Sequence, residues 1–130
     1  MMPNQKTFVT YENQRWWLGR GWCDQMIIGG NRKNSPLNSL NSIFLERSAW
    51  SDYQGNINLP KENFNLPTHQ WRWHGGWEVT ITPQTDQEGW EYATDFSKPF
   101  HPGAQSFDYI RRRRWTRKCI QDLTENQVIN

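Results

Sequence analysis

Apolar and polar positions alternate in several short runs of this chain, and no run shows the 3.6-residue period of an amphipathic helix. Alternation with a period of two is typical of a strand that has one face buried. The first such run, residues 7–17, predicts a strand. Residues 71–81 predict a second one, interrupted by a turn or bulge at Gly75-Gly76, and residues 90–96 alternate in the same way. The pattern therefore predicts an all-β fold of antiparallel strands.

The last predicted strand, residues 110–118, holds five arginines in nine positions, which alternation divides between two faces. One face has Arg111, Arg113, Trp115 and Arg117, and the other has Arg112, Arg114 and Lys118. Cations at this density repel one another unless ring faces and carboxylates lie between them. The acids on predicted strands that can serve as cross-strand partners are Glu12, Glu78, Glu91 and Asp95. We therefore expect a sheet of interleaved tryptophan and arginine.

Turn-forming residues separate these strands. Residues 19–45 predict a long irregular loop, because Gly, Pro, Asn and Ser interrupt every apolar run there. Loops of this length inside a compact domain are usually functional or disordered. Residues 52–70 contain one glycine and two prolines and predict a second connector. By length, residues 1–130 form one domain, with its framework in residues 7–118.

Composition changes the kind of core that this fold can have. Leu, Ile, Val and Phe together make up about 18% of the 130 residues, a share at which disorder is expected. The net charge is only +2, so self-repulsion does not expand the chain, and nine tryptophans replace the missing aliphatic residues. Each indole can bury roughly 150–250 Å². The expected core is therefore aromatic, with arginine stacked on indole.

Sequence patterns of catalytic and metal sites are absent. The three histidines lack the spacing of zinc ligands, and no P-loop, dinucleotide or nucleophile-elbow motif occurs. We therefore expect no enzyme activity, no metal and no cofactor. Cys23 and Cys119 form no CxxC pair, the first 20 residues do not resemble a signal peptide, and no apolar run approaches the length of a membrane span. These features predict free thiols in a soluble, cytoplasmic chain.

Five sequence blocks follow one another in an order that is typical of one known domain. They are YENQRW at residues 11–16, WSD at 50–52, WRW at 71–73, GWEYATDF at 89–96 and RRRRWTR at 111–117. On these blocks, which cover nearly the whole chain, the protein resembles the DysF domain. This domain is named after dysferlin and occurs in proteins of the dysferlin, tectonin β-propeller and peroxin types.

The resemblance implies an elongated antiparallel fold with Trp–Arg stacks in place of an aliphatic core. It also implies a non-enzymatic role at membranes, because family members act in membrane repair, in the handling of damaged organelles and in membrane biogenesis. Tectonin-type domains are associated with sphingomyelin, and peroxin-type domains with phosphatidic acid. The blocks GWEYATDF and RRRRWTR are tectonin-like, which favours sphingomyelin. Roughly residues 19–42 are extra relative to the family pattern.

Seven residues are candidates for lipid contact, namely Trp22, Met26, Ile27, Ile28, Trp50, Phe100 and Phe107. Trp22 and Trp50 lie in or beside predicted loops, and a tryptophan at a loop tip suits the membrane interface. The triplet 26–28 either inserts shallowly into a bilayer or packs beneath its own loop. The two phenylalanines flank the loop before the arginine strand, where aromatic rings can cage a quaternary ammonium.

We expect a monomeric peripheral membrane module that recognises a phospholipid or sphingolipid headgroup at organelle membranes, with sphingomyelin favoured over phosphatidic acid. The basic residues placed to meet lipid phosphate are Arg20, Arg32, Lys33 and Lys98. The alternative is a protein-interaction module that docks a membrane-tethering or lipid-transfer partner through a strand edge. We expect no nucleic-acid binding, because the net charge is small and the arginine strand divides its charges between two faces.

Overall fold

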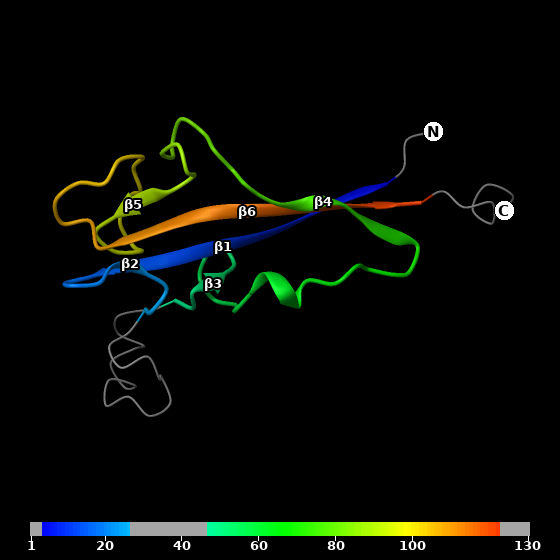
Figure 1. Cartoon of the computed structure of the whole chain (residues 1–130), viewed down its shortest axis with the longest axis horizontal. Helices are drawn as coiled ribbons and strands as arrows, with labels where there is room; N and C mark the ends of the chain where they lie inside the picture. The colour runs from blue at the N-terminus through cyan, green and yellow to red at the C-terminus, as the bar shows by residue number, and fades with distance from the viewer. Residues whose placement is uncertain (1–3, 27–46, 123–130) are drawn as a thin grey trace, which may run out of the picture.

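The computed structural model describes residues 4–26 and 47–122 and shows an elongated antiparallel sheet, which confirms the predicted all-β fold. Its axis is formed by two long strands, β1 (Gln5–Trp17) and β6 (Ile110–Gln121), which lie side by side along the longest dimension of the molecule (Figure 1). They pair from Gln5 opposite Ile120 to Arg15 opposite Ile110. The arginine strand therefore lies in the middle of the sheet, with a partner along its whole length.

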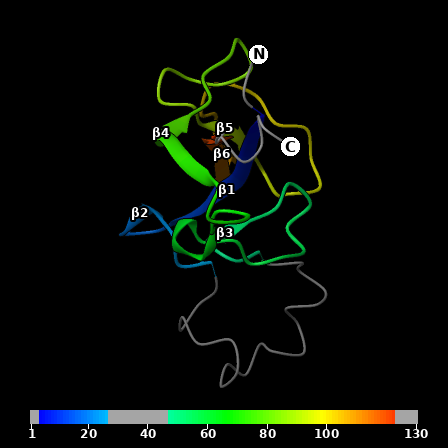
Figure 2. The ribbon, with the colours of Figure 1, turned by 90° about the vertical axis from the view of Figure 1, so that its right-hand side faces the viewer.

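Shorter strands flank this central pair in the described part of the chain. β2 (Gly21–Cys23) and β3 (Trp50–Ser51) pair with one edge of β1, whereas β4 (Trp71–Val79) and β5 (Glu91–Ala93) pair with the opposite edge of β6. A short 3-10 helix, η1 (Lys61–Asn63), precedes β4. Seen along the central strands, the connecting segments lie on several sides of them (Figure 2). Among the described residues no helix has the length and apolar character needed to cross a bilayer.

The shorter strands refine the sequence predictions. The irregularity predicted within residues 71–81 is present, because the register of β4 with β6 shifts between His74 and Glu78. The alternation over residues 90–96 yields only the three strand residues of β5. The chain turns immediately afterwards, where the carboxylate of Asp95 accepts hydrogen bonds from the backbone N–H and the hydroxyl of Ser97.

The expectation of an irregular loop over residues 19–45 is wrong at its beginning, where β2 folds back on β1. The turn between them is closed by a hydrogen bond of 3.0 Å from the backbone N–H of Arg20 to the carbonyl of Trp17. Gly19 and Gly21 have φ angles of 83° and 75°, which glycine adopts without steric cost. Residues 27–45 of the predicted loop lie outside the described residues.

Stacks of arginine on tryptophan cover one face of the sheet, as the sequence predicts. The guanidinium carbon of Arg113 lies 4.2 Å from the ring centroid of Trp90, and that of Arg117 lies 4.0 Å from the ring centroid of Trp73. Contacts of this kind contribute roughly 0.5–2 kcal/mol each, and more when they are shielded from water. We call this side of the sheet the tryptophan face.

Carboxylates complete the two faces. On the tryptophan face, Glu12 Oε1 accepts hydrogen bonds from Arg113 Nε at 2.7 Å and from Trp115 Nε1 at 2.9 Å. On the opposite face, Glu91 forms an ion pair with Arg112, which is only 7% exposed. Two of the four acids proposed as cross-strand partners therefore have that role, and both neutralise cations that the fold has largely removed from water.

Among the side chains with less than 2% exposed surface, the five largest include three polar ones. The five are Thr10, Asn13, Ser51, Ile110 and Cys119. The amide of Asn13 donates hydrogen bonds to Ser48 O at 2.9 Å and Ser51 Oγ at 2.8 Å, which ties β3 to β1. Cys119 and Cys23 are both free thiols, as expected. The interior is thus held by hydrogen bonds and ring stacks, in agreement with the low aliphatic content.

Candidate functional site

Exposed apolar side chains gather at the end of the sheet where β1 ends and β6 begins. They are Leu18, Phe107, Tyr109 and Trp16, with exposed fractions of 89%, 74%, 41% and 38%. A hydrogen bond of 2.8 Å from the backbone N–H of Trp16 to the carbonyl of Tyr109 joins the two segments that bear them. Both segments lie at the left-hand end of the molecule in Figure 1. We call this set of four residues the apolar end.

Phe107 is held outward by a rigid turn. The carboxylate of Asp108 accepts a hydrogen bond from the backbone N–H of Gln105 at 2.7 Å and lies 2.6 Å from His101 Nε2, while Tyr109 N donates to Ala93 O at 3.1 Å. Phe107 itself has a φ angle of 77°, the one positive value among the described non-glycine residues. That conformation costs roughly 1–2 kcal/mol for a residue with a side chain. A strained, exposed aromatic residue indicates a function other than packing.

Leu18 stands on the turn between β1 and β2. The turn is closed by its own backbone hydrogen bond, so its geometry does not depend on the leucine side chain. Beside it, the guanidinium of Arg20 donates a hydrogen bond to the side chain of Gln25. An apolar tip next to a cation is the combination that favours contact with the surface of an anionic or zwitterionic membrane.

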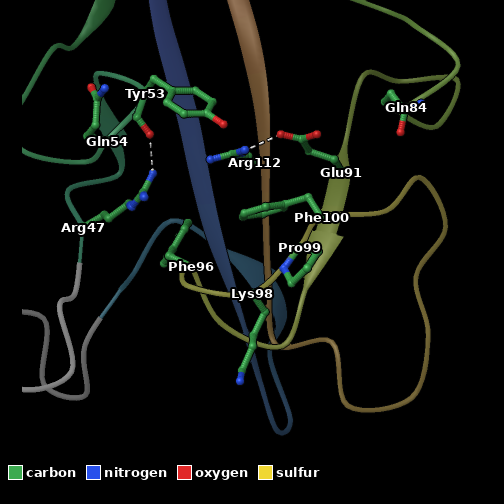
Figure 3. A pocket seen from close by; sticks show the side chains of 10 residues that line it. All are labelled: Arg47, Tyr53, Gln54, Gln84, Glu91, Phe96, Lys98, Pro99, Phe100 and Arg112. Carbon is green, nitrogen blue, oxygen red and sulfur yellow. Dashed lines mark hydrogen bonds and ion pairs between the residues drawn. The ribbon is translucent and has the colours of Figure 1, made fainter.

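A pocket of about 500 Å³ lies on the face of the sheet opposite the tryptophan face. Its lining residues are Arg47, Tyr53, Gln54, Gln84, Glu91, Phe96, Lys98, Pro99, Phe100 and Arg112 (Figure 3). The lining contains three cations, Arg47, Lys98 and Arg112, and one carboxylate, Glu91, so the positive charges exceed the negative ones by two. We call it the basic pocket.

The two arginines of the basic pocket are only partly compensated. The Nη1 of Arg47 donates to the carbonyl of Tyr53 at 2.9 Å, and its guanidinium lies 4.4 Å from the ring centroid of Phe96. Burial lowers the pKa of Arg47 and the nearby charge of Arg112 lowers it further, while the carboxylate of Asp52 opposes both effects only in part. The positive charge at this site is therefore partly shielded from water and repelled by a neighbour, which is the electrostatic condition for anion binding.

Trp22 and Trp50 border loops, as predicted, but both belong to short strands and neither forms an exposed loop tip; their contact with lipid stays a prediction. Trp22 in β2 packs at 5.6 Å against the ring of Tyr92 and lies 4.8 Å from the guanidinium of Arg111. Trp50 in β3 packs at 6.4 Å against the ring of Trp115. Strand pairing and ring contacts assign both residues to the framework.

Only the first residue of the apolar triplet at 26–28 lies within the described part of the chain. Met26 is only 7% exposed, so it packs beneath the chain and does not form a tip. Ile27 and Ile28 lie outside the described residues.

Phe100 and Phe107 flank the same segment but lie in different places. Phe100 is half-buried in the basic pocket, with its ring centroid 3.8 Å from the guanidinium carbon of Arg112. Phe107 belongs to the apolar end and does not line the pocket. The two rings therefore do not form a common cage. Of the five predicted residues that the structure describes, Phe107 is the one that is largely exposed to solvent, on a turn.

Sequence reasoning missed Leu18, Trp16, Tyr109 and Arg47. A weak signal for Leu18 was present, because an apolar residue stands immediately before a glycine, just after the predicted strand 7–17. Arg47 carried no such signal, since its pocket is built from segments far apart in the chain. The described residues contain no cluster of three or more potential metal ligands.

Comparison with known proteins supports the resemblance to the DysF domain. The family model described as "Pex24p: Integral peroxisomal membrane peroxin" matches residues 2–117. The chain is 34% identical over 116 residues to tectonin beta-propeller repeat-containing protein 1 of Gallus gallus, a match that covers 88% of this chain and 8% of the relative.

Two further relatives come from other lineages. The tectonin beta-propeller repeat-containing protein of Drosophila melanogaster is 30% identical over 138 residues, covering 99% of this chain and 9% of the relative. Peroxisomal membrane protein PEX30 of Saccharomyces cerevisiae is 31% identical over 137 residues, covering 88% and 23%. The chain thus spans less than a quarter of the length of each relative. With the family model matched over most of its length, the chain belongs to the Pex24p family and is a DysF-type domain, as its sequence blocks predict.

Proposed function

We propose that this chain is a non-enzymatic, peripheral lipid-binding module that recognises a phospholipid or sphingolipid headgroup at organelle membranes. The observation that supports this function best is the apolar end, where Phe107 is 74% exposed in a strained conformation and Leu18, at the same end of the sheet, is 89% exposed. Neither side chain stabilises the fold in a visible way. Transfer of both side chains from water into the apolar part of a bilayer would be favourable.

The two tips predict weak binding by a single domain. Complete burial of one leucine or phenylalanine side chain contributes about 1.5–3 kcal/mol. Tyr109 and Trp16, behind the tips, are aromatic residues of the kind that accumulate at headgroup level. Binding of this size is reversible, so stable attachment requires a second membrane signal or several copies. The longer relatives provide room for such signals, because this domain is a small part of them.

Family membership supports a role at a membrane and suggests candidate lipids. One relative is named as a peroxisomal membrane protein, and the family description names a membrane peroxin. None of these names denotes a catalyst. The resemblance to tectonin-type domains favours sphingomyelin, and the peroxin-type resemblance favours phosphatidic acid. We propose a role in membrane damage, repair or biogenesis, with sphingomyelin as the first lipid to test.

Vesicle flotation tests this function directly. The wild-type domain and the variants Phe107→Asp and Leu18→Asp are floated with phosphatidylcholine vesicles that contain either sphingomyelin or phosphatidic acid. We expect both variants to lose flotation while their melting temperatures stay near that of the wild type. Ile81→Asp is the matched control, because Ile81 is 60% exposed on a connector outside the apolar end. Equal flotation of all variants would show that the apolar end does not bind membranes.

A protein-interaction module is the alternative, and one feature favours it. Within the described residues, β4 is the last strand in the sheet order and pairs with β6 on one side only. An unpaired edge can add a strand from a partner. Absence of wild-type flotation on every vesicle, together with retention of a membrane-tethering or lipid-transfer protein on the immobilised domain, would favour this function.

A further inference from the structure

The basic pocket holds two guanidinium groups, and partners within residues 4–26 and 47–122 account for only part of their hydrogen-bond donors. Each guanidinium has five N–H donors in a rigid fork. The structure pairs Nε of Arg112 with Glu91 and Nη1 of Arg47 with a backbone carbonyl. The amides of Gln54 and Gln84 line the same space and offer further donors. The pocket is therefore rich in donors and in positive charge at one place.

The aromatic rings of the pocket are unsuited to a quaternary ammonium. Phe100 and Tyr53 already stack on Arg112, at 3.8 and 4.7 Å from its guanidinium carbon, and Phe96 stacks on Arg47. A choline group would therefore meet rings that are already occupied by fixed cations. The one carboxylate that lines the pocket, Glu91, is paired with Arg112 and is not free to balance a second cation.

An anion, in contrast, resolves the electrostatics of the pocket. Two guanidinium groups that share a partly buried space repel each other, and a group with several acceptor oxygens can receive bonds from both. A phosphate group has this chemistry. We propose that the basic pocket is a phosphate-binding site in which Arg47 and Arg112 clasp the anion and Lys98 binds it from the rim. This proposal deepens the proposed function and rests on it for the source of the phosphate.

The position of the pocket sets how a lipid phosphate can reach it. Arg112 is opposite Asn13, and β1 continues for four more residues to Trp17, which is about 13 Å at the rise of a strand. The headgroup layer of a bilayer is only roughly 5–7 Å thick. A sheet standing upright on its apolar end would hold the pocket above that layer. The domain must therefore lie obliquely on the pocket side, and Lys98 extends from the pocket toward the β1–β2 turn (Figure 3).

Titration with inorganic phosphate tests the site without a membrane. Proton NMR signals of the Tyr53 and Phe100 rings are followed in the wild type, in Arg47→Gln and in Lys98→Gln. We expect saturable shifts in the wild type and an apparent affinity lowered roughly fivefold by each substitution. Lys118→Gln is the charge-matched control, since Lys118 is exposed on β6 outside the pocket, and it should behave as the wild type. Absence of shifts in the wild type, or equal losses in all three variants, would overturn the proposal.

Flotation distinguishes the source of the phosphate. The same variants are floated on phosphatidylcholine vesicles containing phosphatidic acid, and on vesicles of equal charge containing phosphatidylserine. A lipid source predicts that Arg47→Gln and Lys98→Gln reduce flotation on phosphatidic acid more than on phosphatidylserine, whereas a soluble phosphate source predicts wild-type flotation of both variants. Phe107→Asp keeps the phosphate shifts but loses flotation. The proposed function and the phosphate site therefore fail in different measurements.

Discussion

The guanidinium carbon of Arg111 lies 3.9 Å from the ring centroid of Trp90, and Arg113, two residues along the same strand, lies 4.2 Å from the same ring. One indole therefore serves two arginines of β6 and separates their charges. Burial lowers the pKa of Arg111, as expected for a guanidinium that the fold partly removes from water. Trp90 itself is only 3% exposed. The charge density of β6 is tolerated because this ring covers it.

Replacement of Trp90 by alanine should strongly destabilise the domain. The substitution removes a nearly buried indole and leaves two guanidinium groups beside a cavity, so we expect a loss of about 3–5 kcal/mol in the free energy of unfolding. Urea denaturation followed by far-UV circular dichroism measures it. Trp16→Ala removes the same side chain from the apolar end and should cost much less. Similar losses in the two variants would contradict the stacked core.

Glu12→Gln should destabilise the sheet through two partners at once. Its carboxylate accepts hydrogen bonds from Arg113 Nε and Trp115 Nε1 and is the ionic partner of Arg113. Loss of the negative charge leaves a mostly buried arginine uncompensated, and we expect a cost of about 1–3 kcal/mol. Denaturation midpoints of Glu12→Gln and of a control at the exposed Glu62, Glu62→Gln, provide the comparison. A wild-type midpoint for Glu12→Gln would show that solvent satisfies Arg113 equally well.

Gly89 occupies a position that no other residue fits. Its φ angle is 88°, and a Cβ placed there would lie 2.2 Å from Val79 Cγ1. Gly89→Ala therefore combines backbone strain with a clash between the connector before β5 and Val79 of β4, and we expect a loss of at least about 1–2 kcal/mol. Gly103→Ala is the control, because nothing lies within 4 Å of a Cβ at that site. Thermal melts of the two variants should differ by several degrees, and coincident melts would rule out this constraint.

The turn after β3 should make the free energy of unfolding depend on pH in the acidic range. Hydrogen bonds from the backbone N–H of Ile57, and then of Asn56 and Gly55, hold the pKa of Asp52 below its ordinary value of 3.8. A folded-state pKa that is depressed means stability that is present above the unfolded-state pKa and is lost as pH falls through the folded value. We expect Asp52→Asn to flatten the stability profile below roughly pH 4. Urea midpoints across this range measure it, with Asp24→Asn as the control; parallel profiles for wild type and Asp52→Asn would contradict the assignment.

Phe107→Gly should separate stability from membrane binding. Glycine adopts a φ angle of 77° without cost, so the variant should gain about 1 kcal/mol of stability at this position, less the entropy that glycine adds to the unfolded chain. The same variant lacks the exposed ring and should float poorly on vesicles. Chemical denaturation and flotation on one preparation give both values. A loss of stability larger than this entropy can explain would mean that the ring packs against the fold in solution.

The strand framework could be predicted from the local alternation of residues, as the arginine strand illustrates. Alternation over residues 110–118 placed Arg112 on one face and Arg113 on the other, and the structure confirms this through their separate partners, Glu91 and Glu12. Period-two alternation is a property of the extended backbone itself, so it survives whatever packs against the strand. The aromatic core followed in the same way from the scarcity of aliphatic residues.

The site was harder to predict because it depends on which loops meet. Trp22 and Phe107 look alike in the sequence, as aromatic residues near glycine or proline, yet one packs in a strand and the other projects from a turn. The difference arises from partners far away in the chain, the Arg111 guanidinium for Trp22 and the Ala93 carbonyl next to the Phe107 turn. Local pattern holds no information about such partners.

The sequence by itself determined the family, the all-β class, the division of the arginine strand and the aromatic nature of the core, because backbone geometry and composition are local properties. The tertiary structure alone decided that Leu18 and Phe107 share one end, and that Arg47, Arg112 and Lys98 share one pocket. The first grouping arises where β1 pairs with β6 and brings residues about a hundred positions apart into register, and the second where segments around β3 and β5 meet over Arg112 of β6. The burial and the electrostatic environment of a side chain depend on all of its neighbours, and these neighbours come together only when the strands have paired.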